Sequence, residues 1–253
     1  MTKPHPIVAV ATNRPSSLSF AQTPVDRETL KCLHGWLHTA RFLTTAPQLE
    51  HLPTLEIPEI AFVGRSNAGK STCINTLTQQ KRLAFASKTP GRTQAINLFG
   101  LGRQGEMDAV LADLPGYGYA AVPQEAKLRW QRVMANYLVT RENLKGVVML
   151  CDPRLGLTEL DEALLEVIRP RVQNDGLQFL ILLTKADKLT RAEAQKALSI
   201  ARLQCAGGQA LLFSALKKQG LDAVAELLWQ WTRTEQSPRT STHPVSPNSQ
   251  TEA

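Results

Sequence analysis

The sequence lacks any apolar run long enough to cross a bilayer. A membrane helix needs roughly 18 consecutive apolar residues, and no stretch of the 253 residues approaches that length. The opening MTKPHPIVAVATNRP also lacks an apolar signal core ahead of a cleavage site. We therefore expect a soluble protein without a membrane partner.

Cysteine is scarce, and its spacing fits neither a metal site nor a disulfide framework. The four cysteines include no CxxC pair, which is typical of free thiols in a reducing compartment. His34 and His38 could share a helix face, but no Glu lies between them and no third ligand is near. We expect an ordinary helix surface there rather than a metal site. The cysteines are Cys32, Cys73, Cys151 and Cys205.

Acidic residues are absent between Glu59 and Glu106, and the whole chain carries a net charge of +7. This excess of positive charge favours a nucleic acid or another polyanionic partner. A phosphate pocket must itself be positive, which accounts for only part of the charge. The basic residues of the acid-free segment are Arg65, Lys70, Lys81, Arg82, Lys88, Arg92 and Arg103.

The two ends of the chain have little apolar content. Residues 234–253 are rich in Ser, Thr and Pro, which predicts a disordered tail, and residues 1–24 predict a flexible segment. Residues 25–57 predict a helical extension and a lead-in, closed by Pro47 and Pro53. The apolar residues near helical spacing in this extension are Leu30, Leu33, Trp36, Leu37 and Phe42.

Apolar runs alternate with helical patterns through residues 58–233. The runs are rich in Val, Ile and Leu, which predicts strands buried on both faces, and the helical patterns fit right-handed crossovers. This order predicts an α/β domain with a mainly parallel six-stranded sheet flanked by helices, whose ligands gather at the carboxyl ends of the strands. The six runs are EIAFVG, AINLFGL, DAVLADL, GVVMLCD, LQFLILLTK and QALLFSAL.

A phosphate-binding loop follows the first of these strands. Residues 64–71, GRSNAGKS, match the pattern GxxxxGK[ST] between a strand and a helical pattern. The glycines let backbone N–H groups point at phosphates, while Lys70 reaches the β- and γ-phosphates. The hydroxyl of Ser71 can bind magnesium.

Asp113 ends the third strand and opens the stretch DLPG. Its carboxylate can hold magnesium through water, and the amide of Gly116 can sense a γ-phosphate. Taken alone, DLPG is more often a simple turn. Its place downstream of the phosphate loop favours the nucleotide role.

The stretch TKAD, residues 184–187, follows the fifth strand and indicates the base. The carboxylate of Asp187 can accept two hydrogen bonds from guanine, which adenine does not offer. Lys185 can lay its aliphatic stem along the ring. FSAL follows at residues 213–216, and the backbone of Ser214 and Ala215 can meet the guanine O6. Together the two stretches favour guanine over adenine.

These motifs, in this order over residues 58–231, resemble the translation-factor-like GTPases. GRSNAGKST, KTPGRTQ and DLPGYGYA, with the lead-in FLTTAPQLEHLP, resemble the EngB family closely, over roughly residues 41–231. The resemblance implies a P-loop NTPase with a Ras-like G domain, a monomeric, magnesium-dependent GTPase of the bacterial cytoplasm. It also implies a switch in assembly of the large ribosomal subunit, with the subunit precursor and its rRNA as partners, and a need for the protein in normal cell division and septation.

By the same resemblance, KTPGRTQ at residues 88–94 would be the first switch, and Thr93 would bind magnesium when GTP is present. Such a loop can close over a γ-phosphate and open when the phosphate leaves. The alternative is an ordinary flexible basic loop.

Tyr117 follows Gly116 at the position where many switch GTPases have the Gln that aims the attacking water. A tyrosine hydroxyl titrates near 10 and is a poor base at neutral pH. Alignment of the water must then come from an inserted group, a partner or a bound cation. Asn67 stands where related GTPases hold potassium, so we hypothesise potassium there. The alternative is that Asn67 only stabilises its own loop by hydrogen bonding.

Three functions are compatible with these patterns. The leading hypothesis is a GTP-driven timer that docks on a ribosomal precursor, through phosphates of its RNA, and leaves after hydrolysis. The alternatives are a guanine-nucleotide-gated scaffold at the division site and a P-loop phosphotransferase, which TKAD and FSAL disfavour.

The expected site residues are grouped by role. Catalytic roles are expected of Lys70, Thr93, Gly116 and Asn67. Ser71 and Thr93 would bind Mg²⁺, Asp113 would bind it through water, and Asn67 would bind K⁺. GTP contacts are expected from Gly64, Arg65, Ser66, Asn67, Ala68, Gly69, Lys70, Ser71, Gly91, Arg92, Thr93, Gln94, Ala95, Asp113, Leu114, Pro115, Gly116, Thr184, Lys185, Ala186, Asp187, Phe213, Ser214 and Ala215.

Overall fold

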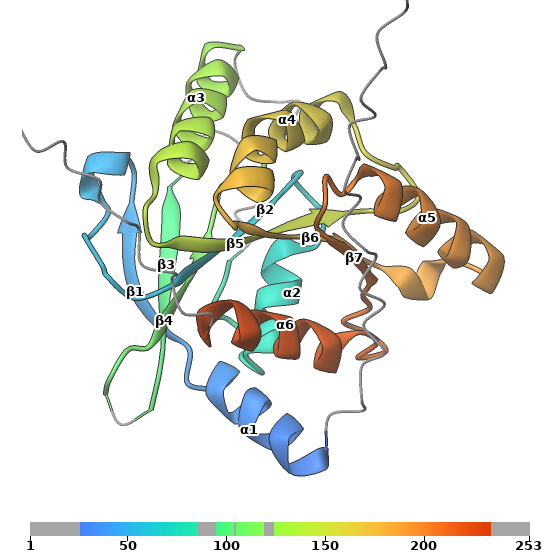
Figure 1. Cartoon of the computed structure of the whole chain (residues 1–253), viewed down its shortest axis with the longest axis horizontal. Coiled ribbons are helices and arrows are strands. Elements are labelled where there is room, and N and C mark those ends of the chain that lie inside the picture. The colour runs from blue at the N-terminus through green and yellow to red at the C-terminus, as the bar shows by residue number, and fades with distance from the viewer. Residues whose placement is uncertain (1–25, 86–94, 104, 119–123, 234–253) are drawn as a thin grey trace, which may run out of the picture.

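One twisted sheet runs through the computed structural model, which describes residues 26–85, 95–103, 105–118 and 124–233. Seven strands follow the order β1-β3-β4-β2-β5-β6-β7 (Figure 1). The four neighbouring pairs from β4 to β7 are parallel, whereas β1 and β4 both run antiparallel to β3. The strands are β1 (Arg41–Ala46), β2 (Glu59–Gly64), β3 (Ile96–Leu101), β4 (Ala109–Asp113), β5 (Leu144–Cys151), β6 (Gln178–Leu183) and β7 (Gln209–Leu212).

The prediction of a mainly parallel sheet is confirmed, but the prediction of six strands is wrong because β1 adds a seventh. Its sequence RFLTTA has neither a solid apolar run nor a regular alternation, since β1 is an edge strand buried only at Ala46. A register shift between Phe42 and Thr44 interrupts its pairing with β3 further. Phe42, counted among the helical apolar residues, therefore lies on this strand and is 58% exposed.

Six α-helices cover the two faces of the sheet among the described residues, three on each side (Figure 1). Two separate apolar cores result, because alternate residues of each central strand point to opposite faces. One face packs against α1 (Arg27–Leu37), α2 (Lys70–Leu77) and α6 (Leu221–Arg233), and the other against α3 (Gln124–Thr140), α4 (Glu159–Asn174) and α5 (Arg191–Gln204). Two short 3-10 helices are η1 (Leu49–His51) and η2 (Ala186–Lys188).

Every residue of β2 is buried, as expected for a central strand covered on both faces. Its first residue, Glu59, is nevertheless acidic and fully buried. Arg141 holds this carboxylate with two hydrogen bonds of 3.0 and 2.8 Å, and the hydroxyl of Tyr137 donates to it as well. The buried charge is thus paired and hydrogen-bonded at the end of the sheet remote from the phosphate loop.

Helix α1 is fixed to α6 rather than standing apart from the domain. Asp26 caps it through hydrogen bonds from the amides of Glu28 and Thr29, both 2.9 Å. Trp36 is buried and meets the ring of Trp229 edge to face at 5.1 Å between centroids. The indole N–H of Trp36 also donates to Asp108 at 2.8 Å, which joins α1 to the turn before β4.

His34 and His38 lie on this helix with ring centroids 6.2 Å apart. His34 pairs with Asp222 of α6 at 2.6 Å. Within residues 26–85, 95–103, 105–118 and 124–233, no cluster of three or more His, Cys, Asp or Glu could hold a metal. Over the same ranges, no helix is both long and apolar enough to cross a membrane.

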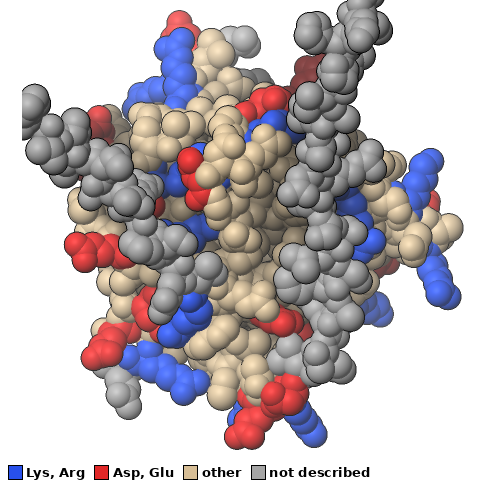
Figure 2. Space-filling view, in the orientation of Figure 1, with Lys and Arg blue, Asp and Glu red and all other residues tan. Residues whose placement is uncertain are grey.

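Charges of both signs are interspersed over the face seen in Figure 2, with Lys and Arg beside Asp and Glu rather than gathered in one patch. Lys81 and Arg82 are exposed in the turn after α2, in the acid-free segment. The predicted flexible segment at residues 1–24 and the predicted tail at residues 234–253 lie outside the described residues.

Candidate functional site

The phosphate-binding loop connects the carboxyl end of β2 to the first turn of α2. Gly64 ends β2 where a Cβ would lie 2.7 Å from the carbonyl oxygen of Leu150, so only glycine fits beside β5. Gly69 has φ 98° at the start of α2, a conformation that glycine adopts without strain. Between them the amide of Ala68 donates to the carbonyl of Arg65 at 3.0 Å, which closes a tight turn. The loop therefore brings its backbone amides to the amino end of α2, where anions bind well.

Lys70 and Asp113 form an ion pair at the centre of the site. The Nζ of Lys70 donates to Oδ1 of Asp113, and both side chains are nearly buried. Asp113 stands at the carboxyl end of β4, beside Phe62 of β2 in the sheet register. Because β4 and β2 are parallel neighbours, the carboxylate faces the loop that β2 leads into.

The residues here fit a magnesium ion bound together with a nucleotide. Ser71 follows Lys70 in the first turn of α2, and Asp113 lies against Lys70. A hydroxyl and a carboxylate are hard oxygen donors, and Mg²⁺ in nucleotide sites is usually held by one or two such groups, phosphates and water.

The loop after β4 lies directly on the phosphate-binding loop. The carbonyl of Tyr117 accepts from the amide of Ser66 at 2.7 Å, and the amide of Tyr117 donates to the carbonyl of Gly64 at 3.3 Å. A Cβ at Gly116 would lie 3.2 Å from the backbone of Ser66. The predicted γ-phosphate sensor thus touches the loop that would hold the phosphates, with Leu114 buried and Pro115 half-buried before it.

The stretch TKAD also contacts the phosphate-binding loop. Thr184 is buried, and its hydroxyl donates to the carbonyl of Ala68 at 2.6 Å. Lys185 has φ 55°, and its Nζ donates to the carbonyl of Asn67 at 2.8 Å. Two predicted motifs more than 110 residues apart in sequence are therefore joined by direct hydrogen bonds.

Asp187 contacts the FSAL stretch through the side chain of Ser214, a contact that the sequence did not predict. The contact expected between the backbone of Ser214 and Ala215 and the guanine O6 stays a prediction. The hydroxyl of Ser214 donates to Oδ1 of Asp187 at 2.6 Å. This hydrogen bond lowers the pKa of the Asp187 carboxyl below its usual range, so the group stays ionised at neutral pH. The amide of Ala186 donates to the carbonyl of buried Phe213 at 3.1 Å. Ala215, two residues after Phe213, is partly buried and packs against the apolar core.

Asp152 is a site residue that the sequence reasoning missed. It follows β5, is 7% exposed, and accepts from Nζ of Lys185 at 3.1 Å and from Arg154 at 2.6 and 2.9 Å. The hydrogen bonds from Arg154, with a further contribution from Lys185, hold the pKa of Asp152 well below its usual range. The sequence did contain an indication of this role, because Asp152 ends the run GVVMLCD. It is therefore an acidic residue at the carboxyl end of a parallel strand, where ligands gather.

Asn67 has φ 66°, in the left-handed region where asparagine is enriched. This backbone geometry explains why an asparagine stands at this position without a potassium ion. The expected switch residues Gly91, Arg92, Thr93 and Gln94 lie outside the described residues, whereas Ala95 is described immediately before β3. Arg65 pairs with Tyr117 as an isolated parallel bridge next to the loop.

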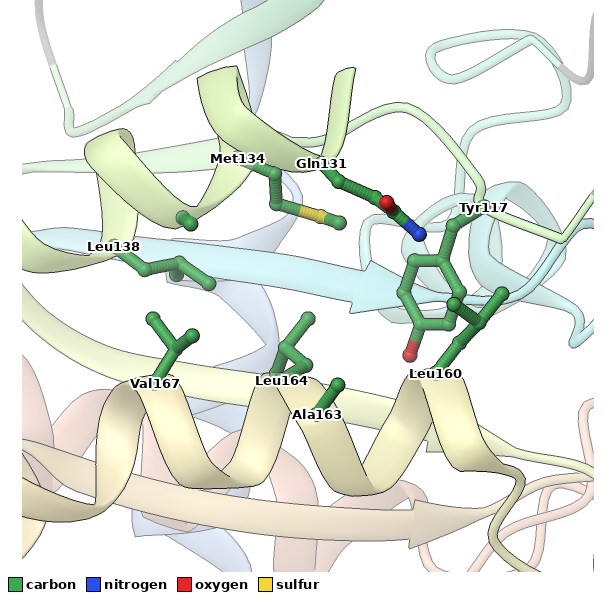
Figure 3. A pocket seen from close by; sticks show the side chains of 9 residues that line it. Tyr117, Gln131, Met134, Leu138, Leu160, Ala163, Leu164 and Val167 are labelled. Carbon is green, nitrogen blue, oxygen red and sulfur yellow. The ribbon is translucent and has the colours of Figure 1, made fainter. Parts of the chain in front are cut away.

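Tyr117 is held by its hydroxyl, which donates to Oδ1 of Asp161 at 2.6 Å. Burial, followed by the neighbouring Asp161 carboxylate, raises the pKa of Tyr117 far above its usual value. The hydroxyl is therefore a hydrogen-bond donor and does not deprotonate water. A pocket of about 200 Å³ opens beside the ring, between α3 and α4 (Figure 3).

Known proteins resemble this chain in sequence and in fold. Residues 59–185 match a family model described as 50S ribosome-binding GTPase. The "Probable GTP-binding protein EngB" of Polaromonas sp. strain JS666 is 71% identical over 221 residues, which cover 87% of this chain and 89% of that protein. The protein of the same name from Paraburkholderia phytofirmans is 50% identical over 204 residues, covering 77% and 92%.

Solved structures share the fold at lower identity. A crystal structure of a "probable GTP-binding protein engB" has a TM-score of 0.53 at 20% identity, covering 69% of this chain and 98% of that one. Aquifex aeolicus Era has a TM-score of 0.56 at 21% identity, covering 72% and 59%. These likenesses show a P-loop GTPase fold. With the match over residues 59–185 and relatives at 71% and 50% identity, the chain belongs to the EngB family of GTP-binding proteins and is a GTPase.

Proposed function

We propose that this EngB-family GTPase is a switch in assembly of the large ribosomal subunit. In its GTP form it docks on a subunit precursor, and hydrolysis to GDP releases it. The observation that carries the proposal is the match of residues 59–185 to a family described as 50S ribosome-binding GTPase. The net charge of +7 supports contact with the phosphates of rRNA. A need for the protein in cell division and septation, and its place in the bacterial cytoplasm as a monomer, belong to the same proposal.

The roles of the site residues follow from their positions. The amides from Gly64 to Gly69 bind the phosphates, Lys70 neutralises the β- and γ-phosphates, and Asp187 accepts from guanine. Ser71 and Asp113 would hold Mg²⁺, which supplies positive charge to the phosphates when it is bound. Thr93 joins them from the first switch. Gly116 lies against the Ser66 backbone, which supports a contact between its amide and a γ-phosphate.

Potassium at Asn67 stays a prediction from the sequence. The left-handed backbone of Asn67 supports the alternative, in which the residue stabilises its own loop. Turnover of GTP in potassium and in sodium salts separates the two, because equal rates, with and without ribosomal particles, would contradict a potassium site.

Co-sedimentation with purified large subunits tests the ribosomal role. We expect the protein bound to a non-hydrolysable GTP analogue to sediment with the subunits, the GDP form to remain behind, and binding to weaken steeply with salt. Tight GTP binding without co-sedimentation in either form would contradict the ribosomal role and favour a scaffold at the division site.

Charge reversal locates the contact surface. Lys81 and Arg82 are exposed in the acid-free segment, so the double variant K81E/R82E should bind subunits more weakly and with a lower salt dependence. The matched control is K196E/R202E, which reverses two exposed charges on α5. Equal loss in both double variants would indicate that net charge alone, and not this surface, sets the affinity.

A further inference from the structure

The backbone of the loop after β4 is attached to the phosphate-binding loop through Tyr117. Its carbonyl accepts from Ser66 and its amide donates to Gly64, at 2.7 and 3.3 Å. Gly116 precedes Tyr117 and has no room for a Cβ without displacing the Ser66 backbone. The position of the Gly116 backbone beside Ser66 therefore depends on where Tyr117 is held.

The side chain of Tyr117 is attached to a different element, the amino end of α4. Its hydroxyl donates to Oδ1 of Asp161, which is 2% exposed. The other oxygen of Asp161 accepts from the amide and the hydroxyl of Thr158, at 2.8 and 2.7 Å, in the capping box that begins α4. Asp161 is thus fixed by the helix, and a hydrogen bond to a buried charged group is strong.

Packing restrains the Tyr117 ring incompletely. One side of the ring faces the pocket of about 200 Å³, whose wall is formed by α3 and α4 residues such as Gln131, Met134 and Leu164 (Figure 3). A ring beside such a space has fewer close-packed neighbours than a ring in a filled core. The bond to Asp161 therefore carries a larger share of the restraint than it would in a filled core.

We propose that Tyr117 and Asp161 are positioning residues for GTP hydrolysis, which together fix the height of the Gly116 amide above the phosphate-binding loop. They act through Gly116 and touch neither the nucleotide nor the water. The chain from α4 to the phosphates runs from Asp161 through the Tyr117 hydroxyl and backbone to Gly116. This inference rests on the γ-phosphate role proposed for Gly116.

Single-turnover hydrolysis by Tyr117→Phe tests the pair, since this change removes only the hydroxyl. We expect the hydrolysis rate at saturating GTP to fall roughly tenfold, in line with the loss of one charge-assisted hydrogen bond. GDP affinity and KM should change by less than about twofold, because the nucleotide contacts remain. A wild-type rate in this variant would overturn the inference.

Tyr137→Phe is the matched control. Tyr137 is a buried tyrosine whose hydroxyl also donates to a carboxylate, that of Glu59, at the opposite end of the sheet from the nucleotide. Loss of this hydroxyl should lower the urea concentration at the midpoint of unfolding and leave the hydrolysis rate unchanged. An equal rate loss in both variants would show a general effect of destabilisation and would overturn a positioning role.

A double-mutant cycle with Asp161→Asn tests whether the two residues act through one bond. The rate of the double variant should match that of Tyr117→Phe alone, because the same interaction is broken twice. Additive losses would overturn the pairing.

Gly116→Ala separates this inference from the role of Gly116 itself. A rate loss in this variant with a normal rate in Tyr117→Phe would overturn the positioning pair alone. Alanine keeps the amide N–H, but its Cβ would lie 3.2 Å from the Ser66 backbone and would shift that amide. A normal rate in Gly116→Ala would show that hydrolysis tolerates such a shift, and would overturn the positioning pair without removing the γ-phosphate role of the amide.

Discussion

Lys185 reaches from the end of β6 to the phosphate-binding loop, where its Nζ donates to the carbonyl of Asn67 at 2.8 Å. The same nitrogen lies 3.1 Å from Oδ2 of Asp152. One cation thus joins the base-recognition stretch, the phosphate-binding loop and the end of β5. Removal of this charge should therefore disturb both the base-recognition stretch and the phosphate-binding loop, and so weaken nucleotide binding.

Lys185→Met keeps most of the aliphatic stem and deletes the donor. We expect GTP and GDP affinities to fall by the same factor, roughly tenfold, because the lost contacts orient the loop and do not depend on the γ-phosphate. Equilibrium titration with fluorescent GTP and GDP measures both constants. Lys196→Met on α5, an exposed lysine remote from these contacts, is the control and should bind both as the wild type does. A selective loss of GTP binding would contradict the orienting role.

Asp187→Asn should change base preference. The carboxylate accepts from two guanine N–H groups, whereas an amide offers one acceptor and one donor, which suits the N–H and carbonyl of xanthine. We expect GTP affinity to fall on the order of 100-fold and xanthosine triphosphate to become the better ligand. Competition of the two nucleotides for the variant measures this, and an unchanged order of preference would exclude Asp187 as the guanine acceptor.

Acid should destabilise the protein partly through Asp152. Its pKa is depressed in the folded state, so its contribution to stability is complete above the unfolded pKa of about 3.9 and is lost as the pH falls through the folded pKa. Asp152→Asn lacks this contribution. The difference in urea midpoint between wild type and Asp152→Asn should therefore be largest near pH 6 and narrow below pH 4. A difference that is constant from about pH 6 to pH 3 would contradict this account.

The Glu59 carboxylate should be costly to leave unpaired. Arg141→Met removes two hydrogen bonds to a fully buried charge, and we expect the free energy of unfolding to fall by about 3–5 kcal/mol. Urea denaturation followed by circular dichroism measures it. Arg169→Met is the matched control, because Arg169 pairs with Glu166 on the exposed surface of α4 and its loss should change little. A similar fall in the free energy of unfolding in both variants would contradict a special cost of leaving the buried Glu59 carboxylate unpaired.

Many of the residues predicted for the candidate site lie close together in the structure, because their motifs are local and lie at strand ends. Gly64 to Ser71, Asp113 and Asp187 come together because parallel strands present their carboxyl ends on one edge of the sheet. Asp152 also lies at the carboxyl end of a parallel strand, but no recognisable motif surrounds it, so the sequence did not single it out. The contact between Ser214 and Asp187 depends on side-chain rotamers, which sequence patterns do not encode.

The parts that were mispredicted depend on distant partners. Strand β1 is held by pairing with β3, some 50 residues later, and its own residues have weak alternation. Phe42 continues the helical spacing of the apolar residues before it, but α1 ends five residues earlier, at Leu37. The sequence did indicate that Tyr117 is a poor base. It could not show the bond from Tyr117 to Asp161, because that bond joins residues 44 positions apart.

The contact of α1 with α6 has a consequence for biosynthesis. Trp36 is among the first described residues to leave a ribosome, whereas Trp229, which covers it, is among the last. The apolar side of α1 therefore cannot pack against α6 until nearly the whole domain has been translated. This side consists of Leu33, Trp36 and Leu37. During that interval the nascent chain exposes an aromatic surface of the kind that makes folding intermediates prone to aggregate.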